Sequence, residues 1–328
     1  MSERLCIVIV NWNVCDLLRD CLRSVYASQP NTPETGDRLA IDGVTVDVKV
    51  VDNASSDDSV SMLRATFPQV DLLVSDTNLG FTAGNNLALL QCDHDYVLLL
   101  NPDTVVSPDA LTTMLRTMRD HPEVGALGPR LLYGDGTPQS SRRRLPNLAM
   151  AMMESTLLEE WFPNNRWRRA YHLCDVPDSV YQEVDWVNGA CMLVRGTVLS
   201  EVGLLDEGFF MYSEELDWCR RMANNGWRVA YTPEAIVTHL EGRSSSQVVA
   251  QRQLYFETSK LRYWLKHHGP GQTLFLRLFL LGTYLLRWLI EGGKWLLGHK
   301  RDLRRQRLTA YCTLLRSGLP PAGTDRDS

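Results

Sequence analysis

In the first 130 residues, short apolar runs alternate with amphipathic stretches of helical period, and no other feature of the chain constrains its fold as strongly. Residues 5–10 and 96–100 are almost entirely apolar, which is typical of strands buried on both faces of a sheet. Strands and helices that alternate at this spacing form a mostly parallel sheet flanked by helices, so the predicted fold class is α/β.

The predicted strands are 5–10, 46–51, 70–75, 96–100 and 124–129, and the predicted helices are 16–28, 57–67, 82–90, 108–121 and 148–162. We expect residues 30–44 to form a loop, 131–145 to form a hairpin or loop, and 163–182 to be irregular. The segment 184–195 is expected to be a strand or strand pair with Gly189 at its centre, a residue that often marks the close approach of a ligand.

Polar residues follow four of the predicted strands at the point where each strand ends. They are Asn11, Asp52 with Asn53, Asn78, and Asn101 with Asp103. The carboxyl ends of parallel strands share one edge of a sheet, and ligands bind at that edge in open α/β folds. Polar side chains gathered there cost stability unless they bind something, so the pattern favours a binding site.

The segment 101–103, Asn-Pro-Asp, carries the most specific of these signals. A hard cation would accept Asp103 as an oxygen ligand and would bridge it to a diphosphate. The alternative interpretation is a turn before the following helix, since all three residue types favour turns.

Three carboxylates crowd into four positions, at Glu214, Glu215 and Asp217, where an amphipathic helix begins. They are either caps stabilised by the helix dipole or a general base with a partner that binds a hydroxyl group. His239 follows a short strand and is either a structural histidine or a metal or phosphate ligand. The arginines at 142–144 either contact phosphates or form a solvated basic loop.

Composition excludes several classes of protein. The formal net charge of −5 argues against a nucleic-acid-binding protein. None of the eight cysteines forms a CxxC pair, which argues against a zinc cluster and favours free thiols in a reducing compartment. The N-terminus shows no signal-peptide pattern, so we expect a cytoplasmic protein.

The chain from residue 247 onward is basic and aromatic. Its apolar run 273–290 approaches the length of a membrane span but contains Arg277 and Arg287. This pattern favours an interfacial helix at a membrane surface, with a buried helical hairpin or a homodimer interface as alternatives. Residues 317–328 are expected to be a disordered tail.

Six motifs in order along residues 4–245 resemble the family 2 inverting glycosyltransferases, and most closely their rhamnosyltransferase-like branch. The motifs are Val-Ile-Val-Asn-Trp-Asn at 8–13, Val-Val-Asp-Asn-Ala-Ser-Ser-Asp at 50–57, Asn-Leu-Gly-Phe at 78–81 with Gly-Asn-Asn at 84–86, Leu-Leu-Asn-Pro-Asp at 99–103, Trp-Val-Asn-Gly-Ala at 186–190, and Phe-Phe-Met-Tyr-Ser-Glu-Glu-Leu-Asp at 209–217. The resemblance implies a GT-A fold, a nucleotide-sugar donor such as a dTDP- or UDP-sugar, and a divalent metal, Mg²⁺ or Mn²⁺.

The resemblance also implies roles for single residues. Asp103 takes the last position of the DxD-type metal motif, with Asn101 in place of its first aspartate, and His239 matches a histidine that contacts the metal or diphosphate. Glu215 matches the catalytic base. The implied donor-binding residues are Asn11, Asp52, Asn53, Asn78, Gly80, Asn85 and Asn101, and the implied acceptor-binding residues are Trp186, Gly189, Glu214 and Asp217.

The implied activity is inverting transfer of a sugar, such as rhamnose or another deoxyhexose, to a hydroxyl group of a cell-surface glycan or lipid-linked acceptor. The predicted organisation is a GT-A domain at 1–245, with a nucleotide-sugar half at about 1–130 and an acceptor half at about 131–245. A membrane-associating helical region follows at 246–316, at the cytoplasmic face of the membrane. The alternatives are a non-catalytic nucleotide-sugar-binding scaffold and a metal-dependent nucleotidyltransferase, although residues 11–13 supply no glycine-rich phosphate loop for the latter.

Overall fold

The structure, a computed structural model, describes residues 3–28, 39–154, 156–240, 249–298 and 300–323. The chain divides into two compact units. The first unit comprises Met1–Leu145, Val176–Asp206 and Glu214–Ser244, and the second comprises Pro146–Asp175, Glu207–Ser213 and Ser245–Ser328. The second unit therefore includes two segments that the sequence predicted to lie in the acceptor half of one GT-A domain.

The first unit contains thirteen strands and six helices within the described residues. The strands are β1 (Arg4–Asn11), β2 (Ala40–Ile41), β3 (Val44–Asn53), β4 (Asp71–Ser75), β5 (Tyr96–Leu100), β6 (Thr104–Val106), β7 (Val124–Leu132), β8 (Pro138–Gln139), β9 (Arg142–Arg143), β10 (Gln182–Val184), β11 (Trp186–Val187), β12 (Cys191–Arg195) and β13 (Arg228–His239). The helices are α1 (Cys15–Ala27), α2 (Ser59–Thr66), α3 (Gly80–Leu89), α4 (Ala110–Asp120), α8 (Gly196–Glu201) and α9 (Glu214–Asn224).

The large sheet has the order β10-β13-β7-β12-β5-β1-β3-β2, with β4 paired to β3, β6 to β13 and β8 to β7. β1 pairs in parallel with both β3 and β5, β4 is parallel to β3, and β7 is parallel to β13. β12 enters antiparallel between β5 and β7. The α/β prediction is confirmed. The antiparallel pairs in this sheet are made by β12 and by the short strands β2, β6, β8 and β10.

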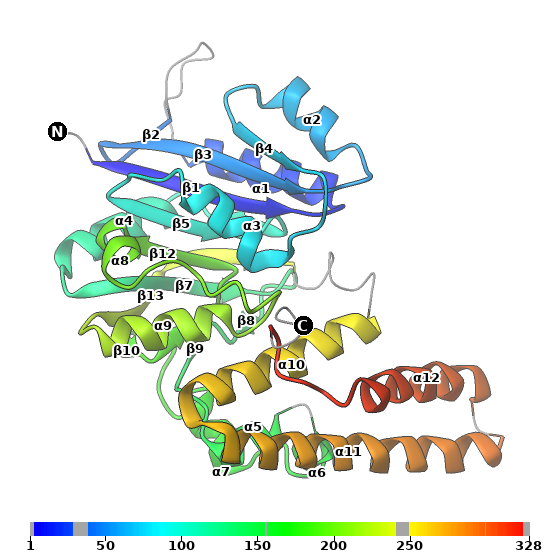
Figure 1. Ribbon diagram of the computed structural model, residues 1–328. Helices are drawn as coiled ribbons and strands as arrows, with labels where there is room; N and C mark the ends of the chain where they lie inside the picture. Colours follow the sequence, from blue (N-terminus) through cyan, green and yellow to red (C-terminus); the bar gives the residue numbers. More distant parts are fainter. Residues whose placement is uncertain (1–2, 29–38, 155, 241–248, 299, 324–328) are drawn as a thin grey trace. The chain divides into compact units, whose positions relative to one another are not determined.

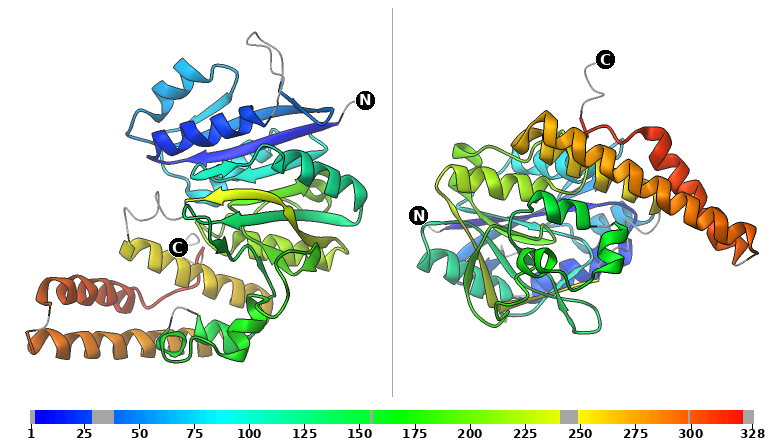
Figure 2. Two further views of the ribbon diagram at one scale, coloured as in Figure 1. Left: turned by 180° about the vertical axis from the view of Figure 1, so that it is seen from behind. Right: turned by 90° about the horizontal axis from the view of Figure 1, so that it is seen from below.

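Helices cover both faces of this sheet. α3, α8 and α9 lie over the face nearer the viewer in Figure 1, and α1 and α4 lie over the opposite face, seen from behind in Figure 2. α1 buries Leu18, Leu22 and Val25 against the core. α3 approaches β1 so closely that a Cβ at Gly84 would stand 2.9 Å from a methyl carbon of Val10, so any larger residue there would displace Val10.

The second unit contains α5 (Leu148–Met153), α6 (Leu157–Trp161), α7 (Arg166–Tyr171), α10 (Val249–His268), α11 (Pro270–Leu296) and α12 (Arg301–Ser317). The predicted helix 148–162 is therefore broken, because Glu154 is extended with ψ of 122°. The region 163–182, expected to be irregular, contains α7. α11 and α12 lie side by side (Figures 1 and 2).

The two arginines within α11 contact protein groups of the same unit. Arg277 donates from Nε to the Gly318 carbonyl oxygen at 2.7 Å, and Arg287 donates to Glu160 at 2.6 Å. Both guanidinium groups are therefore held by protein partners within the second unit. Their contacts leave α11 with an exposed apolar stripe made of Leu274, Phe275, Leu278, Leu285, Leu286 and Leu289.

The predicted disordered tail, residues 317–328, includes residues that are ordered in the structure. Leu319 is fully buried, and the Ala322 N–H donates to the Thr258 carbonyl oxygen at 2.9 Å. Arg262 in turn donates to the Ala322 carbonyl oxygen. These contacts hold the segment 319–322 against α10, and residues 324–328 lie outside the described part of the chain.

Candidate active site

The ends of β1 and β3 form the first part of the site. Asn11 Nδ2 donates to Asp52 Oδ2 at 2.9 Å and to Ser55 Oγ at 3.1 Å. The Ser55 N–H donates to the other oxygen of Asp52 at 2.9 Å. Both Asn11 and Asp52 are almost completely buried. Because parallel pairing places Asn11 opposite Asp52, the sheet register alone brings these two predicted donor residues together.

Asn53 and Asn78 shape the loop that precedes α3. Asn53 Nδ2 donates to Asn78 Oδ1 and to the Gly80 carbonyl oxygen, and its Oδ1 accepts the Leu79 N–H at 2.9 Å. Gly80 has φ of +82°, a conformation that favours glycine. Asn85 donates within its own helix, to the Phe81 carbonyl oxygen at 2.8 Å. This contact engages the Asn85 Nδ2 group within α3.

Asp103 and His239 meet where β6 pairs with the end of β13. His239 Nε2 lies 3.3 Å from Asp103 Oδ1, and both side chains are buried. His239 Nδ1 lies 3.0 Å from Gln139 Oε1, which fixes the ring so that Nε2 faces the carboxylate. The backbone N–H of Asn101 donates to the Ala190 carbonyl oxygen at 2.8 Å, while Asn101 Oδ1 is a buried atom with no hydrogen-bond partner among the described residues.

This donor set suits a divalent cation. It offers a carboxylate oxygen and an imidazole nitrogen whose second nitrogen is anchored. Two positions before Asp103, Asn101 adds an amide oxygen without a hydrogen-bond partner among the described residues. Oxygen-rich sets with one imidazole bind Mg²⁺ and Mn²⁺. Asp103, His239 and Asn101 are thus the residues of this region that could hold a metal.

Glu214 and Glu215 begin α9, directly after Tyr212 and Ser213, which both have positive φ. Glu214 is buried and Glu215 is half-buried. Burial raises the pKa of both carboxyl groups, and the neighbouring Glu215 raises the pKa of Glu214 further. One oxygen of each, Oε2, is buried without a hydrogen-bond partner in the part of the chain that the structure describes.

Gly189 lies beside the second of these carboxylates. A Cβ at Gly189 would stand 3.6 Å from Cβ of Glu215, and the backbone of Gly189 forms a hydrogen bond that lowers the pKa of Glu215. Arg143 lowers this pKa as well, through its positive charge. Its guanidinium carbon lies 4.7 Å from the centre of the Trp186 ring, and Trp186 Nε1 donates to the Arg144 carbonyl oxygen.

Two expectations for charged residues are corrected. Asp217 is fully buried and pairs at 2.8 Å with Arg221, which also donates to the carbonyl oxygens of Val202 and Leu204. We therefore assign Asp217 a structural role rather than acceptor binding. Arg142 is buried as well and donates to Gln182 and to the Val176 carbonyl oxygen, so the segment 142–144 is not a wholly solvated loop.

Comparison with known proteins decides the family. The model of the glycosyltransferase like family 2 matches residues 3–254. The chain is 30% identical over 253 residues to N-acetylglucosaminyl-diphospho-decaprenol L-rhamnosyltransferase of Mycobacterium tuberculosis, over 74% of this chain and 82% of that protein. It is also 27% identical over 197 residues to rhamnosyltransferase WbbL of Escherichia coli, over 56% of this chain and 69% of that protein. The chain belongs to glycosyltransferase family 2.

The fold of this glycosyltransferase agrees with that assignment. The mannosyltransferase PcManGT from Pyrobaculum calidifontis, solved in complex with GDP-Man and Mn²⁺, superposes with a TM-score of 0.53 at 16% identity. The match covers 97% of this chain and 87% of that chain. The GT-A fold expected from the sequence motifs is thereby confirmed.

Several residues of the glycosyltransferase's candidate site were not identified from the sequence. Gln139 is 100 positions from His239 and is brought to it by the β7–β8 hairpin. Arg143 was named only as a possible phosphate contact in the basic segment 142–144, and its effect on Glu215 follows from the pairing of β9 with β11. Ser55 could have been identified from the sequence, since it lies within the motif at 50–57 that resembles family 2 glycosyltransferases.

The buried acid pair predicts the pH dependence of the glycosyltransferase's stability. The folded-state pKa of Glu214 lies above its ordinary value of 4.5. At pH values between 4.5 and the raised pKa, the folded protein therefore keeps a proton that the unfolded chain has lost. Stability should therefore fall as pH rises from about 4.5 through the raised pKa. Glu214→Gln removes this effect and should stabilise the protein by about 1 to 3 kcal/mol at mildly alkaline pH.

Urea denaturation of wild type and Glu214→Gln at acidic and at mildly alkaline pH measures this difference. The matched control is Glu234→Gln, because Glu234 lies on an exposed position of β13. A Glu214→Gln variant no more stable than wild type at alkaline pH would show that the carboxylate is solvated or paired in the folded protein.

Proposed function

We propose that this glycosyltransferase moves a sugar, rhamnose or another deoxyhexose, from a dTDP- or UDP-sugar to a hydroxyl group of a lipid-linked or glycan acceptor, with inversion at the anomeric carbon. The observation that carries the proposal is the half-buried Glu215, whose Oε2 has no hydrogen-bond partner among the described residues and whose pKa is raised by burial. The rhamnosyltransferase names of two relatives support the choice of sugar.

The donor is proposed to bind in the half formed by residues 1–130 and the acceptor in the half formed by 131–245. Asn11, Asp52, Asn53, Asn78 and Gly80 would form the nucleoside end of the donor site, where their hydrogen bonds already order the loops. Asp103 and His239, with Asn101 beside them, would hold Mg²⁺ or Mn²⁺. That metal would neutralise charge on the departing diphosphate.

Glu215 acts as the base in this mechanism. Its carboxylate accepts the proton of the acceptor hydroxyl as the oxygen attacks the anomeric carbon from the face opposite the leaving nucleoside diphosphate. Direct displacement inverts the configuration at that carbon. Gly189 has no side chain beside the carboxylate, and the Arg143 cation counters the effect of burial on the pKa of Glu215.

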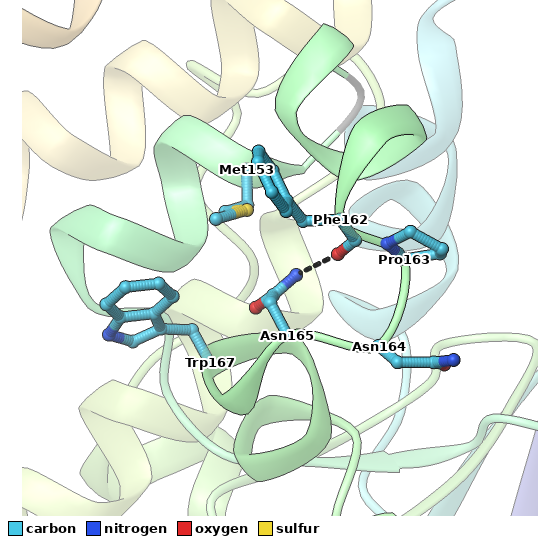
Figure 3. Close-up of a pocket in the computed structure, with 6 residues that line it drawn as sticks. All are labelled: Met153, Phe162, Pro163, Asn164, Asn165 and Trp167. Atoms are coloured by element: carbon cyan, nitrogen blue, oxygen red, sulfur yellow. Dashed lines mark hydrogen bonds between the residues drawn. The ribbon is translucent and has the colours of Figure 1, made fainter.

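The second unit supplies apolar surfaces that suit a lipid-linked acceptor and a membrane. A pocket of about 480 Å³ is lined mainly by apolar side chains, as Figure 3 shows. Its lining residues are Met153, Phe162, Pro163, Asn164, Asn165 and Trp167. α11 is long and apolar enough to cross a membrane by length and composition, and only 28% of its most apolar stretch is buried.

We further propose that the second unit binds the cytoplasmic face of a membrane without spanning it. The exposed stripe of α11 would enter the acyl boundary, while exposed basic residues of α12, such as Arg301 and Arg305, would meet anionic headgroups. Leu278 is 60% exposed at the centre of this stripe.

The membrane proposal predicts flotation with vesicles that contain phosphatidylglycerol, weakened by high salt. Leu278→Asp should weaken binding about tenfold or more, because burying one leucine contributes about 1.5 to 3 kcal/mol. Leu90→Asp is the matched control, since Leu90 is an exposed leucine of the first unit. Flotation that resists salt and needs detergent for release would indicate a true span, and absence of flotation would favour a packing or homodimer role for α11.

A thermal-shift screen tests the enzymatic proposal. We expect stabilisation by a dTDP- or UDP-sugar that increases when Mg²⁺ or Mn²⁺ is added. A non-catalytic scaffold would be stabilised in the same way but would neither transfer nor hydrolyse the sugar. A nucleotidyltransferase would instead release diphosphate from a nucleoside triphosphate and a sugar phosphate, and that product would contradict the proposal.

A further inference from the structure

A second cluster of metal-binding residue types lies in the first unit, near the amino-terminal end of β1. Cys6, Cys92 and His94 place one ligand atom each within 4.8 Å of the other two. The two sulfur atoms are 2.9 Å apart. Cys6 pairs with residues of β3 and β5 near the start of β1, whereas Asn11 of the candidate active site ends the same strand. The cluster is therefore separate from the residues proposed for sugar transfer.

His94 has the surroundings of a metal ligand. Its side chain is only 4% exposed, and its Nε2 lies 2.9 Å from Asp47 Oδ2. Its other ring nitrogen, Nδ1, is a buried atom with no hydrogen-bond partner in the described chain. Histidines that bind metals usually direct one ring nitrogen to a carboxylate and leave the other for the ion. Asp47 supplies that carboxylate here.

Arg4 lies against the same carboxylate and ring. Its Nη2 donates to Asp47 Oδ2 at 3.3 Å and lies 3.2 Å from His94 Nε2. Arg4 therefore helps to hold Asp47 in place behind His94.

His94 is also among the residues that line a hollow of about 400 Å³. The charged residues of that hollow are Glu3, Asp93, Asp95 and Arg195, and neither cysteine lines it.

We propose that Cys6, Cys92 and His94 bind a borderline-soft divalent metal, Zn²⁺ by preference, at a site independent of the sugar-transfer reaction. Two thiolates and one imidazole are the ligands that Zn²⁺ takes, with water in the fourth position. Tetrahedral bonds of about 2.3 Å to zinc would hold the sulfur atoms about 3.8 Å apart, so binding separates them by about 0.9 Å. A disulfide needs only the two cysteines, and it would not explain the carboxylate behind His94.

Co²⁺ titration of the reduced full-length protein tests the site, because sulfur-to-metal charge-transfer absorption arises only from thiolate ligands. Wild type should develop the band as one Co²⁺ ion binds per protein chain. Added Zn²⁺ should displace Co²⁺ and remove the band. Cys92→Ser and His94→Gln should abolish it or shift it strongly. Asp47→Asn should weaken affinity on the order of 10- to 100-fold. Cys174→Ser, which removes an exposed cysteine, is the matched control and should leave the titration unchanged.

Three results would overturn the metal site. One is the absence of a charge-transfer band in wild type, and another is a band that survives unchanged in both Cys92→Ser and His94→Gln. The third is a Cys6–Cys92 disulfide, found by mass spectrometry in protein purified without reductant, that still forms when Zn²⁺ is present in excess. Circular dichroism of each variant shows whether a lost band reflects lost folding, and Asp47→Asn gives a graded result in a protein that keeps all three ligands.

Discussion

Glu215→Gln is expected to lower the rate of sugar transfer on the order of 100- to 10,000-fold while leaving donor affinity unchanged. Glutamine keeps the size and hydrogen-bonding shape of the side chain but cannot accept a proton. Only the step that removes the acceptor's hydroxyl proton should therefore suffer. The same base predicts that the wild-type rate rises with pH through the raised pKa of Glu215, since the carboxylate must be ionised to act. Turnover at saturating donor and acceptor across pH measures both effects.

Glu214→Gln is the matched control for this variant. It removes the adjacent carboxylate, which is more deeply buried than Glu215. Asp217→Asn is unsuitable, because breaking the buried pair with Arg221 should cost about 3 to 5 kcal/mol of stability. If Glu215→Gln stays within a few-fold of wild type while Glu214→Gln loses transfer, the base is the other carboxylate. If both remain active, the acids only cap α9.

Asp103→Ala is expected to remove the part of donor affinity that depends on Mg²⁺ or Mn²⁺, a loss of about tenfold or more, or at least about 1.4 kcal/mol. The carboxylate is the charged ligand of the proposed metal site, and His239 remains held by Gln139 after its removal. Calorimetric titration of the donor nucleotide with Mn²⁺ and with a chelator separates the two contributions to affinity.

The control for Asp103→Ala is Asp109→Ala, an exposed aspartate before α4 whose side chain makes no capping hydrogen bond. Asp109→Ala should bind donor as wild type does. If the metal-dependent affinity of Asp103→Ala for the donor equals that of wild type, the assignment of Asp103 as a metal ligand is wrong. The GT-A fold assignment does not depend on this result.

The sequence was informative where local pattern decides structure. Continuous apolar runs correctly predicted β1 and β5, and parallel pairing then placed Asn11 against Asp52. Asp103 and His239 were both suggested as metal ligands, and the structure brings them within 3.3 Å, although their role stays a prediction. The spacing of four between Asp217 and Arg221 was a readable signal of an ion pair on one helix face that the sequence interpretation missed.

Other features depend on contacts that no local pattern carries. Cys6 and Cys92 lie 86 positions apart, so the absence of a CxxC pair said nothing about their meeting in space. In the sequence, Arg277 and Arg287 interrupt an apolar run. Only the structure shows that Gly318 and Glu160 accept hydrogen bonds from them. The antiparallel insertion of β12 between β5 and β7 likewise follows from tertiary packing.

The anomeric configuration of the product tests the central proposal most directly. The protein would be incubated with a dTDP- or UDP-deoxyhexose, Mn²⁺ and a diphospholipid-linked sugar acceptor, and the new glycosidic bond examined by NMR. Direct displacement assisted by Glu215 predicts a bond whose configuration is opposite to that of the donor, formed by wild type and lost in Glu215→Gln. Retention of the donor configuration, or release of free sugar without any new bond, would contradict it.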